Sequence, residues 1–181
     1  AAVMRAQNAP LEIEEVEIDD PAAGEVLVKT AASGICHSDL HIITGDIPIP
    51  PPCILGHEPA GIVEKVGAGV TDFAEGDHVI GCVSAWCGLC KFCTGGRPYL
   101  CPSQYAPRDA ALGPRLTRGG ETIDQFANLS SFAEKMLCPE RSLVKIRDDM
   151  PLAQAPRVGW RVTRGLRPER RPGREASRSS G

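Results

Sequence analysis

Four cysteines lie within fifteen residues, at Cys87, Cys90, Cys93 and Cys101, and this spacing restricts the local fold more than any other feature of the chain. Thiolates this close together suit a closed tetrahedral zinc site, which ties a loop-rich lobe together without taking part in a reaction. Disulfides between such near neighbours would be strained in several pairings. An iron–sulfur cluster also fits less well, because the gap before Cys101-Pro102 is longer than the bacterial ferredoxin motif allows. The spacing therefore predicts a structural zinc.

A second group of metal-binding and titratable side chains lies upstream, in two short segments. The group consists of Cys36, His37, Ser38, Asp39, His41, His57 and Glu58. Cysteine and histidine are common zinc ligands, and a carboxylate often orients a ligating imidazole. Singly, Cys36 would more often be a core residue and His41 a surface residue, so the grouping carries the argument. A catalytic zinc usually takes three protein ligands, and two are clear here.

Both patterns, in this order, resemble the zinc-dependent alcohol dehydrogenases of the medium-chain dehydrogenase/reductase superfamily. The resemblance covers roughly the first 155 residues, and its main motifs lie at residues 24–29, 34–39, 56–58, 76–80, 87–101 and 131–134. It implies a GroES-like catalytic domain of mainly β (α+β) structure, a partly open β-barrel with a zinc-stapled lobe. It also implies a catalytic zinc, a structural zinc, and NAD(P)-dependent interconversion of a small-molecule alcohol and its aldehyde or ketone.

The resemblance assigns a role to each residue of the presumed catalytic metal site. Cys36 and His57 match two of the catalytic zinc ligands. Glu58 matches a carboxylate that lies near the metal and approaches it when the water leaves. Asp39 matches the residue that holds the far ring nitrogen of His57 and so fixes its tautomer.

The resemblance also implies how substrate, cofactor and proton are handled. Ser38 matches a hydroxyl that hydrogen-bonds the alcohol oxygen and begins a proton relay, through the cofactor ribose, to His41 near solvent. His37 lies where the family often places a basic residue against the cofactor pyrophosphate. Ile47 and Val83 fall at positions that commonly line the substrate pocket, and the small Val83 weakly favours a bulky or long substrate.

The C-terminal segment departs from the family pattern. Beyond Ala155 the family has a Gly-Cys-Gly core that supplies the third zinc ligand, whereas Trp160 occupies that place here. An indole offers only an N–H donor and cannot replace a thiolate. No Gly-x-Gly-x-x-Gly follows a strand, so we expect the Rossmann domain to be absent from this sequence. The sequence thus predicts either a truncated or frameshifted enzyme domain, inactive alone, or a zinc-binding remnant such as a pseudogene product.

A change in charge marks the same boundary. Residues 1–156 hold 12 Lys+Arg and 21 Asp+Glu, a balance of −9, while residues 157–181 hold eight Arg and two Glu, a balance of +6, which together give −3. We expect residues 1–155 to form one catalytic domain and residues 156–181 a divergent, disordered Arg-rich tail. Arginine without lysine or interleaved tyrosine is not typical of a nucleic-acid-binding arm, so no nucleic-acid partner is expected.

The hydrophobic pattern completes the expectations. It predicts a short helix at residues 37–43 and strands within residues 11–18, 25–30, 54–70, 77–83 and 132–146. No run approaches transmembrane length, so no membrane partner is expected, and thiols beside zinc motifs favour the reducing cytoplasm. The family is usually homo-oligomeric, but the dimerising domain is not recognisable in this sequence.

Overall fold

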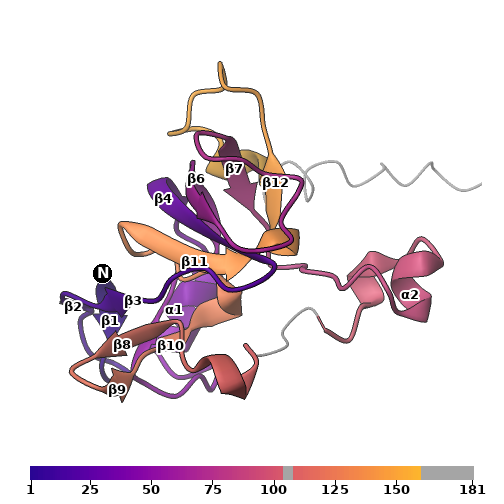
Figure 1. Cartoon of the computed structure of the whole chain (residues 1–181). Coiled ribbons are helices and arrows are strands. Elements are labelled where there is room, and N and C mark those ends of the chain that lie inside the picture. The colour runs from indigo at the N-terminus through magenta and orange to yellow at the C-terminus, as the bar shows by residue number, and fades with distance from the viewer. Residues whose placement is uncertain (104–107, 160–181) are drawn as a thin grey trace, which may run out of the picture.

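The computed structural model describes residues 1–103 and 108–159, and short β-strands in three open sheets dominate it (Figure 1). The largest sheet has five antiparallel strands in the order β11-β4-β6-β7-β12. Its strands are β4 (Glu25–Gly34), β6 (Glu58–Val66), β7 (His78–Gly81), β11 (Lys135–Pro139) and β12 (Leu143–Lys145). The predicted mainly β fold is confirmed, although the sheets are open and do not close into a barrel.

Two smaller sheets and several short helices complete the fold. The four-stranded sheet β10-β5-β1-β2 and the three-stranded sheet β3-β8-β9 lie side by side in Figure 1. Their strands are β1 (Ala2–Met4), β2 (Glu12–Ile13), β3 (Glu17–Ile18), β5 (Cys53–Ile54), β8 (Leu116–Arg118), β9 (Glu121–Thr122) and β10 (Asp124–Gln125). The helices are α1 (His37–Ile43), α2 (Lys91–Thr94), η1 (Pro98–Leu100), η2 (Ala110–Leu112), η3 (Phe126–Asn128) and η4 (Glu140–Ser142). None of the helices within residues 1–103 and 108–159 is long and apolar enough to cross a bilayer.

The main core lies against the five-stranded sheet. Val26 and Val28 of β4 are buried there with Val63 of β6, Val79 of β7 and Met136 of β11. Burying one such side chain stabilises the fold by about 1.5–3 kcal/mol, so these strands are held together chiefly by apolar contact. The β4–β6 pair is the most extensive in the molecule and fixes where the two strands end.

The ends of β4 and β6 bring the upstream cysteine and histidine together. Gly34, the last residue of β4, pairs with Glu58, the first residue of β6. Cys36 follows β4 and His57 precedes β6, so the antiparallel register places both at the same edge of the sheet. A Cβ atom at Gly34 would lie 2.1 Å from the Glu58 Oε2 atom, so any larger residue there would force that carboxylate to move.

Most predicted elements occur where the pattern placed them, with one clear exception. The helix at residues 37–43 is confirmed. The single strand predicted across residues 11–18 is wrong, because β2 and β3 are separate strands in different sheets. The chain turns inward between them, where Glu14 is buried and accepts hydrogen bonds from Arg5 and Arg118. A carboxylate in an alternating acidic segment gives no sign, in sequence, that it will be buried.

The four-cysteine segment forms a lobe that projects from the sheets and contains α2 (Figure 1). The lobe contacts the body through Trp86, whose ring lies under the Arg141 guanidinium at 4.5 Å. Helix α2 contributes no buried residue. The lobe therefore has little apolar core of its own.

The described fold continues through the boundary predicted at residue 155. Ala155 is fully buried, and Val158 packs against the cluster that Ala155 forms with Ala60 and Ile80. The rest of the predicted tail, including Trp160, lies outside the described residues.

Candidate metal sites and substrate pocket

The upstream group forms a compact three-donor site at the edge of the largest sheet. One ligand atom each from Cys36, His57 and Glu58 lies within 4.8 Å of the other two. His57 and Glu58 are buried, and Cys36 is half-buried at the N-terminal end of α1. A thiol, an imidazole and a carboxylate that meet in this way have the donor chemistry of a zinc site.

Asp39 organises the backbone and the imidazole around this site. Its side chain is almost completely buried, and its Oδ2 atom accepts a hydrogen bond from the Cys36 backbone N–H at 3.0 Å. Its Oδ1 atom lies 3.2 Å from the Gly56 nitrogen and 3.2 Å from the His57 Nδ1 atom. A neutral imidazole that donates from Nδ1 to a carboxylate presents its Nε2 lone pair, the atom a metal would bind. The position predicted for Asp39 beside His57 thus matches the geometry.

The electrostatics of the cysteine and histidine reflect their contact. Burial alone would raise the pKa of the Cys36 thiol, but hydrogen bonds from Ser38 and the nearby His57 outweigh it and lower that pKa. The Ser38 hydroxyl lies 3.0 Å from the Cys36 sulfur. Burial alone would lower the pKa of His57, but Asp39 and Cys36 outweigh it and raise that pKa. The thiolate is the form of cysteine that binds a metal, so a lowered pKa favours metal binding by Cys36.

The two remaining histidines of the segment lie on the accessible side of α1. The His41 Nδ1 atom lies 3.0 Å from the Asp46 Oδ2 atom, and the side chain is partly exposed. The His37 ring meets the His41 ring edge to face, with 4.7 Å between the ring centroids. The predicted relay from Ser38 to His41 and the predicted cofactor contact of His37 therefore stay predictions, although all three residues share one helix with an exposed face.

A pocket of about 830 Å³ opens beside the metal site. Ser38 and His57 line it together with Val83, as expected for the last residue, whereas Ile47 does not line it and Ile49 does. The motifs did not reveal Phe126, which also lines the pocket and packs its ring against the His57 imidazole at 5.2 Å. In the sequence, nothing except its aromatic side chain marks Phe126 as a pocket residue, because it lies far downstream of His57.

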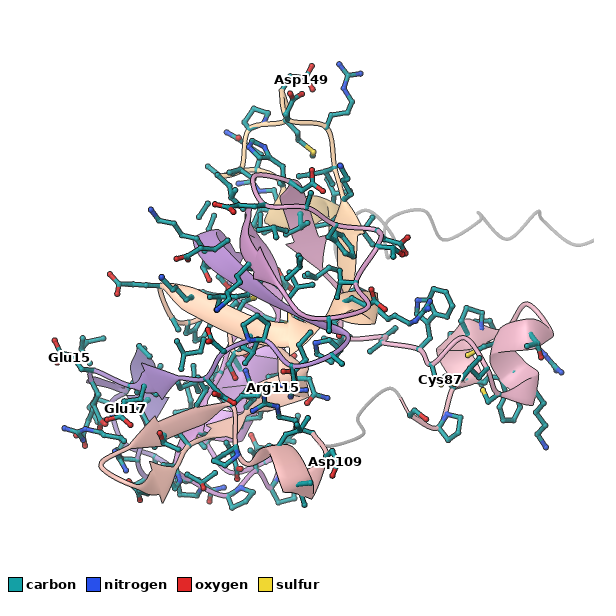
Figure 2. The ribbon with its side chains drawn as sticks, viewed as in Figure 1. Glu15, Glu17, Cys87, Asp109, Arg115 and Asp149 are labelled. Carbon is teal, nitrogen blue, oxygen red and sulfur yellow. The ribbon has the colours of Figure 1, made fainter. Side chains whose placement is uncertain are left out.

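Two buried arginines support the wall of this pocket (Figure 2 labels Arg115). Arg115 donates from Nε to Glu25 at 2.7 Å and from Nη1 to Gln125 and Asn128 at 3.2 and 2.9 Å. Arg108 donates from Nη2 to the other Glu25 oxygen at 2.9 Å. Since Glu25 begins β4, these bonds tie the pocket wall to the largest sheet.

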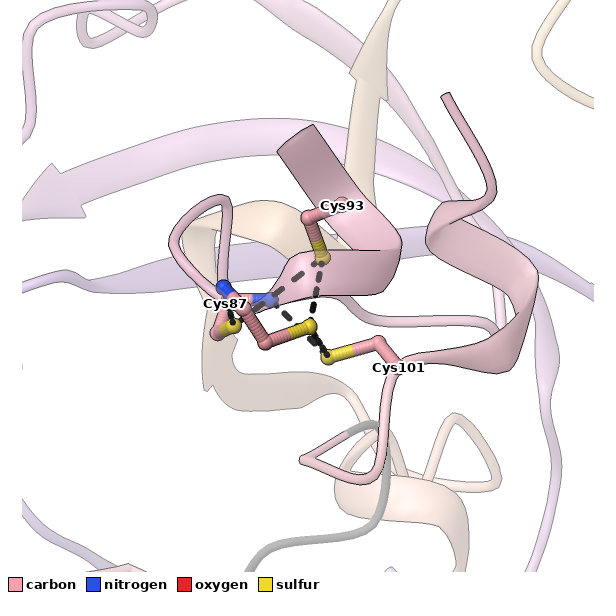
Figure 3. Close-up of side chains that lie close together, drawn as sticks. Cys87, Cys93 and Cys101 are labelled. Atoms are coloured by element: carbon pink, nitrogen blue, oxygen red, sulfur yellow. Dashed lines mark hydrogen bonds between the residues drawn. The ribbon is translucent and has the colours of Figure 1, made fainter. Parts of the chain in front are cut away.

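The four cysteines of the lobe converge on one point (Figure 3). The sulfur of Cys93 lies 3.5 Å from that of Cys90 and 3.9 Å from that of Cys87, and the sulfurs of Cys90 and Cys101 lie 4.0 Å apart. Four thiolates on one zinc, at about 2.3 Å each, would lie roughly 3.8 Å apart, so these residues fit that ion. All are free thiols, which sets aside the disulfide alternative for this arrangement.

The surroundings of these thiols also favour a metal. Backbone N–H groups of Leu89 and Cys90 point at the Cys87 sulfur from 3.5 and 3.4 Å. These hydrogen bonds lower the pKa of Cys87 to about 6, whereas burial raises the pKa of Cys93 to about 11. Neighbouring thiols cannot all ionise without a cation among them, which is what a bound zinc would provide.

A small, mainly β body that carries a Cys–His–Glu group beside a pocket, and a separate four-cysteine lobe, belongs to the class of zinc-binding GroES-like domains. The model of the alcohol dehydrogenase GroES-like domain matches residues 22–148. The chain belongs to this family.

Curated proteins and solved structures agree with this family. The chain is 41% identical over 168 residues to an NDMA-dependent alcohol dehydrogenase of Amycolatopsis methanolica, covering 91% of this chain and 45% of that protein. It is similar, with 39% identity and a TM-score of 0.80, to an alcohol dehydrogenase zinc-binding domain protein from Burkholderia ambifaria, covering 88% of this chain and 44% of that one. A benzyl alcohol dehydrogenase from Acinetobacter calcoaceticus gives 34% identity and a TM-score of 0.78 over 88% and 44% of the two chains. The chain thus spans about half the length of the relatives it matches.

Proposed function

We propose that this chain provides the metal-binding and substrate-binding half of a zinc-dependent alcohol dehydrogenase, which interconverts an alcohol and its aldehyde or ketone with NAD(P). The observation that carries the proposal is the meeting of Cys36, His57 and Glu58 at the edge of a large, mostly apolar pocket. The proposal is also supported by the family to which the chain belongs, whose named members include alcohol dehydrogenases.

The residues around the metal would divide the work between holding and orienting. Cys36 and His57 would be direct zinc ligands, with Glu58 as the third donor or as a carboxylate that approaches when the fourth position is vacated. Asp39 would keep His57 in the tautomer that presents Nε2. When bound, zinc supplies Lewis acidity that makes an alcohol hydroxyl more acidic, and a nicotinamide cofactor accepts the hydride.

The pocket and helix α1 would position the substrate and move its proton. Ser38 lines the pocket beside His57, where its hydroxyl could accept the proton of an alcohol substrate. His41, which is partly exposed and already hydrogen-bonded to Asp46, would pass that proton to solvent. His37 would contact an anionic part of the cofactor. Val83 and Phe126 present an apolar wall that excludes water and admits a small-molecule alcohol or aldehyde with a hydrophobic body.

A second candidate function is zinc binding without turnover. The feature that favours it is Trp160, which in the sequence takes the place of the cysteine that supplies the family's third zinc ligand and cannot serve as a ligand. In that case the four-cysteine zinc would be tightly held, while a metal at Cys36 and His57 would be labile and easily removed by a mild chelator.

Cobalt substitution combined with an activity assay tests both candidates. The 181-residue chain, its Cys36→Ala variant and a control Cys82→Ala, whose thiol belongs to neither metal group, would be loaded with Co²⁺ and their thiolate charge-transfer absorption compared. The proposed site predicts loss of part of that absorption in Cys36→Ala only. Turnover would be followed as NADH or NADPH absorbance at 340 nm with short, long-chain and aromatic alcohols.

The two readouts separate the outcomes. Turnover that disappears in Cys36→Ala supports the dehydrogenase for this chain. A Cys36-dependent cobalt site without turnover supports zinc binding alone. Equal cobalt spectra in all three proteins would refute the proposed metal site.

A further inference from the structure

His37 and His41 form a pair of imidazoles that neither cysteine-containing group uses. They occupy the first and fifth positions of α1, and residues four apart in a helix lie one above the other on the same face. Their rings meet with 4.7 Å between centroids and an interplanar angle of 69°. His37 is exposed and His41 is partly exposed, so a solute can reach both.

The ring separation agrees with what a shared metal ion requires. A divalent ion bound to two imidazole nitrogens at about 2.0–2.1 Å holds the ring centroids roughly 4.5–5.2 Å apart for angles between square and tetrahedral. The observed 4.7 Å lies inside that range, so the spacing of the two rings is compatible with a shared ion.

His41 also has the support that metal-binding histidines usually have. Its Nδ1 atom lies 3.0 Å from the Asp46 carboxylate, which holds one ring nitrogen and leaves Nε2 as the atom available to a metal. Asp46 is held in turn by the Thr44 hydroxyl at 2.7 Å, at the end of the same helix. A carboxylate–imidazole–metal arrangement of this kind orients the ring and makes the ligand more basic.

We propose that His37 and His41 bind one divalent transition-metal ion, such as Zn²⁺ or Ni²⁺, with Asp46 as the orienting carboxylate and water in the other coordination positions. This is a two-ligand site, weaker than the four-cysteine site and separate from the Cys36–His57–Glu58 group. Imidazole ligands suit zinc, copper and nickel, whereas Mg²⁺ and Ca²⁺ prefer oxygen and would not bind here.

Occupation of this site has a consequence that rests on the proposed function. An ion on the His41 Nε2 atom removes the position that would receive the proton, and it draws His37 away from a cofactor anion. An excess of zinc or nickel would therefore inhibit the enzyme without displacing the catalytic metal. Because binding is measured without turnover, failure of the proposed function would leave the metal site itself testable.

Calorimetric titration with Ni²⁺ tests the site directly. The chain is first saturated with zinc and freed of excess, so that the thiolate sites are filled, and then titrated with NiCl₂. We expect one weaker site per chain. His37→Ala and His41→Gln should each lower its affinity at least tenfold, and Asp46→Asn about tenfold, as for other residues that orient a metal ligand. His78→Gln on β7 is the matched control, because it removes an imidazole that lies on a strand instead of on α1, and it should leave the titration unchanged.

Nuclear magnetic resonance supplies a second readout that does not depend on the variants folding equally well. In the wild-type chain, paramagnetic Ni²⁺ should broaden the ring signals of His37 and His41 at concentrations that leave His78 sharp. Three results would overturn the proposal. They are the absence of a Ni²⁺ site in the zinc-loaded wild type, a Ni²⁺ affinity of His37→Ala and His41→Gln equal to that of the wild type, and broadening centred on other residues.

Discussion

Replacing Asp39 with asparagine turns one carboxylate oxygen into an NH₂ group, in the buried residue that connects the metal site to two loops. The carboxylate receives three N–H donors, from Cys36, Gly56 and the ring of His57. Asparagine keeps the shape of the side chain but has one acceptor oxygen and one NH₂ group. Whichever way the amide turns, at least one of these donors then faces another donor.

The cost follows from that count. If the amide oxygen takes the Oδ1 position, it keeps Gly56 and His57 but leaves the Cys36 N–H unpaired, which costs about 1–3 kcal/mol in a buried site. The lost negative charge in the first turn of α1 adds about 0.3–1 kcal/mol. We expect the free energy of unfolding to fall by about 1–4 kcal/mol in total. With a urea dependence of about 2 kcal/mol per molar, the midpoint should drop by about 0.5–2 M.

Urea denaturation of the zinc-loaded Asp39→Asn variant checks this value. The exposed carboxylate Asp72 offers a matched control, and Asp72→Asn should stay within about 0.5 kcal/mol of the wild type. The same variant should bind the metal at Cys36 and His57 about 10–100-fold more weakly, because a neutral amide oxygen supports the His57 imidazole less strongly than a carboxylate does. A variant with unchanged stability and unchanged metal affinity would show that Asp39 does not organise this site.

Three further perturbations follow from other contacts. Cys93→Ser should lower both the zinc content and the thermal midpoint, and atomic absorption with scanning calorimetry would reveal whether the lobe closes on a metal. Gly34→Ala should displace the Glu58 carboxylate, whose Oε2 atom lies 2.1 Å from the added Cβ position. Cobalt binding at the upstream site should therefore weaken while the lobe stays unchanged, and an unaltered cobalt spectrum would contradict this. The Glu14 pKa is lowered first by its hydrogen bond from Arg5, so its stabilising contribution is present above its ordinary pKa of 4.5 and is lost as the pH falls through the lower folded value. Glu14→Gln should therefore flatten the pH dependence of stability below about pH 5, which acid titration of the unfolding midpoint can measure.

The parts of the site that the sequence predicted best are those that are local or that follow a family motif. The four cysteines lie within one short segment, so their spacing alone predicted that they converge. The helix at residues 37–43 followed from its pattern, and it carries Ser38, Asp39 and His41 on one short segment. The meeting of Cys36 with His57 depended on the resemblance, since their separation along the chain carries no geometric signal until the β4–β6 register is known.

The features that the sequence did not predict depend on contacts between distant segments. Phe126 packs against His57 although the two lie far apart in the sequence, and Glu25 pairs with Arg115 across 90 positions of sequence. Neither pair belongs to a periodic pattern. In the sequence, residues that will form a buried ion pair also look the same as residues that will stay exposed. The burial of Glu14 was not predicted either, because it depends on its contacts with Arg5 and Arg118.

The projecting lobe has a consequence for the life of the protein in a cell. Its apolar side chains are largely exposed, 87% for Leu89 and 63% for Tyr99, and α2 buries no residue. With little apolar core, the lobe would hold its shape through a metal bound by the four thiols, and without that metal it would become an open loop on an otherwise folded body. Proteases cut such loops in preference to folded sheets. The supply of zinc at synthesis would thus set how long each molecule survives, with cleavage near residues 87–101 as the signature of a chain that matured without its metal.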